Sequence, residues 1–114
     1  MKLKMLAAAV AVISMAAPAF AKDASAKMII HNAVADYAKW RPVYDADTEN
    51  RTKAGLTDCQ VHASADNAND LFVVCDMADL AKGKAFATSK ALATTMAGAG
   101  VIGKPDIYFL TPTR

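Results

Sequence analysis

The stretch from Asp36 to Gly55, DYAKWRPVYDADTENRTKAG, constrains the fold of this 114-residue chain more than any other. It begins with an aspartate, whose carboxylate can accept hydrogen bonds from the unpaired amides at the start of a helix. It ends with a glycine, which readily adopts the left-handed conformation that follows a helix. Between them, Tyr37, Trp40 and Tyr44 recur at helical spacing. We therefore predict a helix that lays an aromatic stripe across a sheet.

The same stretch contains a proline and a basic residue that bear on this helix. Pro42 lies too far in to be a first-turn proline, so we expect it to kink the helix or to separate a short first turn from the main helix. Arg51 continues the inward stripe. It either anchors an anionic ligand from there or pairs on the surface with Asp47, four residues earlier, and the sequence favours neither.

The rest of the chain supplies four strands and a second helical region. The segments 28–34 and 71–77 are apolar on both faces, which predicts central strands. The segment 57–64 alternates between apolar and polar residues, and the segment 106–110 lies between prolines as edge strands do. Asp79 and Ser89 are the expected caps of the two helical segments. The strands are expected at 28–34, 57–64, 71–77 and 106–110, and the helical segments at 80–88 and 90–97, with a loop over 101–105.

This β-α-β-β-α-β order predicts an α+β, ferredoxin-like fold, in which the helices cover one face of a four-stranded antiparallel sheet. Phe72 and Val74 then point to the other face. Because an exposed apolar sheet face usually has a partner, we expect a symmetric homodimer whose sheets face each other or close into a barrel.

The N-terminal residues predict export. Met1–Ala21 has two lysines, an apolar run of about a dozen residues, too short to span a bilayer, and small residues before a cleavage point after Ala21. We predict a signal peptide at 1–21, a flexible lead-in at 22–27 and one domain at 28–114, in the periplasm or secreted, with no membrane attachment after cleavage. Only 2 of the 13 Lys and Arg, and none of the 11 Asp and Glu, precede Lys22, so the remainder is neutral. With no basic cluster, nucleic acid is not an expected partner.

The two cysteines, Cys59 and Cys75, are predicted to share the helix-facing side of the sheet. If Ser64 pairs with Asp70 in a regular hairpin, the two cysteines lie directly opposite, within disulfide reach. A disulfide there would contribute about 3 kcal/mol in an oxidising compartment. Two buried thiols are the alternative, because a one-residue bulge would separate them.

Several side chains have both a structural and a functional interpretation. Trp40 and Tyr44 are core residues or the wall of a pocket for a flat ligand. His31 and His62 are structural or solvated, or one of them is a general base or haem ligand. Neither histidine has a second ligand at metal spacing, and the Cys-x-x-Cys-His haem motif is absent. We therefore expect no metal and no cofactor.

Three segments carry a resemblance to a known superfamily: VADYAKWRPVYD (34–45), RTKAG (51–55) and DMADLAKGKAF (76–86). With SKAL…MAGAG (89–100) and IYFL (107–110), they resemble the dimeric α/β-barrel superfamily, and within it the antibiotic-biosynthesis-monooxygenase-like domains. The resemblance implies a ferredoxin-like protomer, a homodimer and a pocket between helices and sheet. Members include cofactor-independent monooxygenases, haem-degrading enzymes and isomerases.

The monooxygenases of this superfamily tend to place Asn, Trp, Tyr and Arg around the substrate. Here the resemblance gives Asn32, Trp40, Tyr44 and Arg51 for these places, and His62 is a further catalytic candidate. The predicted ligand-binding set is Trp40, Tyr44, His62, Phe72 and Phe86. We predict an exported homodimer that binds a small, flat, largely apolar molecule; the alternatives are a cofactor-independent monooxygenase for an aromatic or quinol substrate, and a structural dimer with a filled core.

Overall fold

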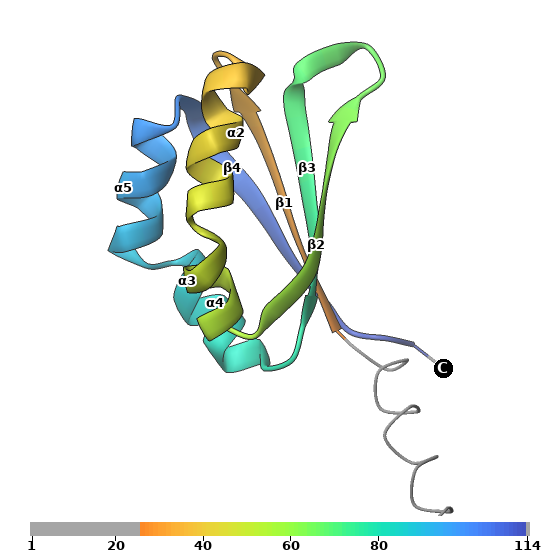
Figure 1. Cartoon of the computed structure of the whole chain (residues 1–114). Helices are drawn as coiled ribbons and strands as arrows, with labels where there is room; N and C mark the ends of the chain where they lie inside the picture. The colour runs from red at the N-terminus through yellow and green to blue at the C-terminus, as the bar shows by residue number, and fades with distance from the viewer. Residues whose placement is uncertain (1–25, 114) are drawn as a thin grey trace, which may run out of the picture.

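A computed structural model describes residues 26–113 of the chain. The elements follow the order β-α-α-β-β-α-α-β, and Figure 1 shows all four helices on one face of the sheet. They are β1 (Ala26–Val34), α2 (Tyr37–Ala46), α3 (Thr48–Lys53), β2 (Leu56–Ser64), β3 (Asn67–Met77), α4 (Leu80–Ala87), α5 (Lys90–Gly98) and β4 (Val101–Leu110). The predicted signal peptide lies outside the described residues.

The sheet has the strand order β2-β3-β1-β4 with antiparallel pairing throughout, which confirms the ferredoxin-like prediction. The two strands with apolar residues on both faces, β1 and β3, are central as predicted. Their helix-facing side chains alternate with partly exposed ones, as strand geometry requires. The buried set includes Met28, Ile30, Leu71, Val73 and Cys75. The core therefore lies between the helices and one sheet face.

The first helical region starts as predicted but breaks elsewhere. Asp36 caps α2 by accepting from the Ala38 amide at 2.9 Å. Pro42 lies inside α2, so the alternative of a separate first turn that ends there is wrong, and the helices separate at Asp47 instead. Pro42 costs one backbone hydrogen bond, but Ala38, whose carbonyl it leaves free, is exposed and water can replace the donor. Gly55, at φ 81°, follows the end of α3.

The second helical region divides as predicted. The side chain of Asp79 caps α4 through the Lys82 amide, and that of Ser89 caps α5 through the Leu92 amide. Gly83 is buried in α4, where an added Cβ would lie 2.5 Å from Met77 Sδ. The glycine that weakens this helix therefore allows its close approach to β3.

The hairpin between β2 and β3 differs from the regular one at both ends. Ser64 pairs with Asn67 rather than Asp70, because β3 starts four residues earlier than predicted and its pairing shifts beside Ala63. A second irregularity follows Thr57, where Asp58 has φ 49°. The register between these points is the predicted one, with His62 opposite Phe72. The Cys59–Cys75 disulfide is present, with a Cα–Cα distance of 4.0 Å.

Strands β1 and β4 are longer than predicted. β1 begins at Ala26, where Lys27 pairs with Leu110 on one side and forms an ion pair with Asp76 on the other. β4 begins at Val101, so the predicted loop over 101–105 is wrong. Its pairing with β1 shifts around Gly103, at φ 72°, and Pro105. The bulge accommodates a proline that has no amide to donate. Within residues 26–113 no helix is long and apolar enough to cross a membrane.

Candidate functional site

A cavity lies between the helix layer and the sheet. The cavity volume is about 50 Å³, several times what one water molecule requires. Five predicted residues line it: Asn32, Trp40, Tyr44, Arg51 and Phe86. The remaining wall is mostly apolar and comprises Met28, Ile30, Val43, Asp47, Val73, Cys75, Leu92, Thr95, Met96 and Ala99. A mostly apolar cavity with a few converging polar groups is typical of a small-molecule site.

The aromatic wall comes from successive turns of α2. The rings of Trp40 and Tyr44 stack with centroids 4.8 Å apart and planes inclined by 20°. Trp40 is 4% exposed, so helix packing fixes its ring. Tyr37 lies in the first turn, half-buried, with its ring 5.9 Å from that of Trp40. Sequence periodicity predicted this stripe because one helix face packs on one sheet face.

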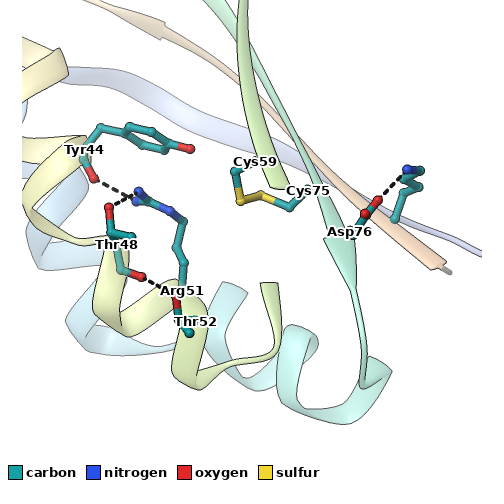
Figure 2. The surroundings of a disulfide bond; sticks show 8 residues. Tyr44, Thr48, Arg51, Thr52, Cys59, Cys75 and Asp76 are labelled. Atoms are coloured by element: carbon teal, nitrogen blue, oxygen red, sulfur yellow. Dashed lines mark hydrogen bonds and ion pairs between the residues drawn. A yellow bond between two sulfur atoms is a disulfide. The ribbon is translucent and has the colours of Figure 1, made fainter. Parts of the chain in front are cut away.

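Arg51 brings a positive charge into the same wall. The side chain is only 8% exposed, and its guanidinium lies 3.7 Å from the centroid of the Tyr44 ring. It donates to the Tyr44 carbonyl oxygen at 2.8 Å and to Thr48 Oγ1 at 3.0 Å (Figure 2). The alternative of a surface pair with Asp47 is therefore wrong. Asp47 lies at the break between α2 and α3, where its carboxylate accepts from Asn50 at 2.6 Å.

Two polar atoms of the cavity wall are buried without a hydrogen-bond partner: Asn32 Oδ1 and the Tyr44 hydroxyl. Asn32 is 5% exposed on central strand β1, beside the irregular pairing with β4. Burial raises the pKa of Tyr44 above its ordinary value, although Arg51 and Arg41 oppose the shift. The Tyr44 hydroxyl therefore stays neutral at physiological pH and can donate one hydrogen bond and accept others.

The disulfide belongs to the cavity wall as well. Cys75, on β3, faces the cavity, while Cys59, on edge strand β2, faces a groove on the far side of Tyr44 and Arg51. Figure 2 shows the sulfur atoms beside the Tyr44–Arg51 pair. The sequence offered the bond as one of two alternatives and did not predict this place, because the position of the bond relative to the helices depends on how the helices pack.

His62 and Phe72 do not line the cavity, which corrects their predicted grouping with Trp40 and Tyr44. Alternate residues of a strand point to opposite faces, so Val73 faces the helices while Phe72 faces away. His62 lies opposite Phe72 and shares that outer face. His31 stacks on Phe72 there with centroids 4.2 Å apart, and its Nε2 lies 2.7 Å from Asp70 Oδ1.

The residues that sequence reasoning missed lie mainly on β1, β3 and α5. The alternation of β1 could have found Met28 and Ile30, which share a face with Asn32. Thr95 and Ala99 gave no signal, because small residues on a helix fit a packed interface as well as an open one. Among the described residues, no group of three His, Cys, Asp or Glu side chains is placed to hold a metal ion.

No protein family profile matches this chain, and no curated protein sequence does. Solved structures do resemble it. A putative antibiotic biosynthesis monooxygenase from Bordetella bronchiseptica superimposes with a TM-score of 0.66 at 13% identity, over 80% of this chain and 99% of that one. A mutant of SnoaB, a cofactor-independent oxygenase from Streptomyces nogalater, gives 0.61 at 10% identity over 79% and 94%. A conserved protein from Methanosarcina mazei Go1 gives 0.63 at 13% identity over 82% and 99%.

These likenesses concern the fold, since the identities are low. The chain has the ferredoxin-like fold of the antibiotic-biosynthesis-monooxygenase-like domains, as the sequence resemblance implied. The superpositions include 99% of the Bordetella and of the Methanosarcina chain, so the likeness extends over the whole of those domains.

Proposed function

We propose that this protein is an exported homodimer that binds a small, flat, largely apolar molecule in the cavity beside Trp40 and Tyr44. One observation carries the proposal: two buried polar atoms, Asn32 Oδ1 and the Tyr44 hydroxyl, have no partner at the wall of an open apolar cavity. Each such atom costs about 1–3 kcal/mol when it is left unpaired. A ligand that supplies a donor and an acceptor would recover this cost.

The remaining space argues against the structural dimer with a filled core. Phe86 and Met96 line the cavity but do not fill it, and Phe72 lies on the other face of the sheet. A single aromatic ring is the natural occupant, because the stacked Trp40–Tyr44 wall offers it a flat apolar surface. Polar substituents on that ring would reach the unpaired atoms.

Direct binding measurements test this proposal. Trp40 is the only tryptophan and lines the cavity, so tryptophan fluorescence reports on the cavity. We expect phenols and small quinols to quench or shift this emission with saturation, and calorimetry to give the same affinity. Trp40→Phe should weaken binding several-fold in calorimetry, whereas Lys39→Met, one residue away on the exposed side of α2, should not. Absence of saturable binding across a panel of one-ring and two-ring aromatics would refute the proposal.

A second candidate is a cofactor-independent monooxygenase, supported by the fold shared with oxygenases and by the joint placement of Asn32, Trp40 and Arg51 at one cavity. In such a reaction an activated anthrone CH₂ group and O₂ give a quinone carbonyl and water, so the substrate itself supplies the electrons. Arg51 would stabilise the substrate oxyanion that forms when the carbon loses its proton.

Oxygen uptake separates the two functions. With hydroxylated anthrones and quinols, an oxygenase consumes O₂ faster than the buffer does, and Trp40→Phe lowers the rate. Binding of the same compounds without accelerated uptake would leave the binding function and reject the monooxygenase.

A further inference from the structure

We propose that the cavity selects aromatic acids: a single planar ring that bears one carboxylate, which pairs with Arg51. This inference rests on the proposed binding function and adds the charge of the ligand. It starts from an uncompensated positive charge in the cavity wall. Arg51 is 8% exposed, yet it belongs to none of the ion pairs between described side chains.

The partners of Arg51 are all neutral groups. They are a backbone carbonyl, a hydroxyl and the face of an aromatic ring. A guanidinium has five N–H donors, and these contacts use two of them, so three remain. A buried cation is costly unless an anion compensates it, and the ring face of Tyr44 does so only in part. The geometry therefore leaves both charge and donors for an anion.

The nearest carboxylate does not fill this role. Asp47 lines the cavity, but its Oδ1 accepts from Asn50 Nδ2 at 2.6 Å and it makes no ion pair with Arg51. The Asp47 carboxylate makes the electrostatic potential in the cavity more negative, although it does not contact the guanidinium. We therefore expect the cavity to take one negative charge and not two, which favours a carboxylate over a phosphate.

The size of the cavity and its other polar atoms limit the rest of the ligand. The cavity volume of about 50 Å³ is less than the roughly 150 Å³ of a cavity that holds benzene, so it admits no more than one ring, and wall side chains must move to admit that ring. Thr95 and Phe86 also line a wider groove between α3 and the α4–α5 pair, where Lys53 and Lys82 lie. A substituent on the ring can extend into this groove, where the two lysines outnumber the single carboxylate of Asp47 and favour an acidic ligand.

Benzoate and benzamide form a matched pair of probes, because they have nearly the same shape and differ in charge. By calorimetry on the full mature protein near neutral pH, we expect benzoate to bind about 10- to 100-fold more tightly, as a charge-assisted hydrogen bond provides. Arg51→Met should remove this preference, and Arg51→Lys should keep part of it. Lys39→Met is the control: it removes a positive charge from the exposed side of α2 and should leave the preference unchanged.

The ligand pair decides the question in the wild-type protein, even if Arg51→Met does not fold. Equal affinity for benzoate and benzamide would overturn the charge preference and leave the proposed binding function intact. Absence of binding by either probe, and by the neutral phenols, would overturn both. An Asp47→Asn variant gives an independent check: benzoate should bind it more tightly, while unchanged affinity for both probes would count against an anion held at Arg51.

Discussion

At the residue scale, the site combines an aromatic stack with polar atoms that the folded chain leaves unpaired. Tyr44 contributes to the site through three groups. Its ring packs between Trp40 and the Arg51 guanidinium, its carbonyl accepts from Arg51, and its hydroxyl is buried without a partner. The ring and carbonyl support the fold, whereas the hydroxyl makes no hydrogen bond with the described residues. Stability and binding can therefore be separated at this residue.

Tyr44→Phe is expected to leave the protein as stable or to stabilise it by up to about 1 kcal/mol, because it removes an unsatisfied buried polar group but keeps the ring. Ligand affinity should fall several-fold. Urea unfolding and calorimetry measure the two effects. A loss of more than about 1 kcal/mol on Tyr44→Phe would mean that the hydroxyl has a structural partner.

The raised pKa of Tyr44 also predicts a dependence of stability on alkaline pH. Burial is the main cause of the shift, so the folded protein holds this proton at a pH where the unfolded chain, with an ordinary pKa of about 10, releases it. The contribution is complete below that pH and is lost as the pH rises through the folded value. Unfolding midpoints should therefore fall more steeply above about pH 10 in wild type than in Tyr44→Phe. Parallel curves would contradict this.

At the scale of elements, the disulfide fastens edge strand β2 to central strand β3 next to the cavity. Cys59 follows the irregular pairing at Asp58, where the ladder by itself holds the strand least well. The covalent bond compensates for this weak point.

Replacing both cysteines, Cys59→Ser with Cys75→Ser, should lower the free energy of unfolding by about 3 kcal/mol, since the bond closes a loop between residues 16 apart in sequence. Chemical denaturation measures the change. A reductant should produce a similar loss in the wild-type protein and none in the double variant. Equal stability of the oxidised and reduced wild-type protein would show that the bond is not formed.

The two helical glycines in the α4–α5 pair make a matched test of packing. At Gly98, nothing lies within 4 Å of an added Cβ, so Gly98→Ala should be neutral or stabilise by up to about 1 kcal/mol. At Gly83, an added Cβ would lie 2.5 Å from Sδ of Met77, which is 2% exposed, so the Met77 side chain must move within the core. Gly83→Ala should therefore destabilise by about 1–3 kcal/mol in thermal unfolding. A stabilising Gly83→Ala would mean that α4 does not approach β3 this closely.

At the scale of the whole molecule, the outer sheet face is the surface through which we propose that the protein dimerises. Tyr108, Leu110 and Ile102 are 51%, 44% and 58% exposed, and the first of these lies beside Ile29 on β1. The helices cover only the opposite face (Figure 1). An exposed apolar face of this kind is the basis of the proposed homodimer.

Sedimentation of the purified protein at micromolar concentration should give twice the mass of its single chain. Tyr108→Glu should shift the protein to monomers, because it buries a charge in the proposed interface. Ala93→Glu, exposed on α5 away from this face, should remain dimeric. A monomeric wild-type protein would refute the homodimer, and a dimer that withstands Tyr108→Glu would place the interface elsewhere.

The sequence by itself determined the order of the elements and the inward aromatic stripe. Helix caps at Asp36, Asp79 and Ser89 and the period of Trp40 and Tyr44 are local properties, and the structure confirms them. The register that brings Cys59 opposite Cys75 also came from the sequence, which left a disulfide and two buried thiols as alternatives; the structure shows the disulfide. Local propensity and strand alternation suffice for such features.

Only the tertiary structure decided which side chains share the cavity that this stripe lines. The bulges in β2 and β4 depend on pairing between distant segments, so the extent of β4 and the surroundings of Asn32 could not be predicted locally. Arg51 does not pair with Asp47. The packing of α2 on α3 instead places the guanidinium against the carbonyl and ring of Tyr44 and the hydroxyl of Thr48. His62 was separated from Trp40 by the sheet itself, whose two faces the chain must divide between core and surface.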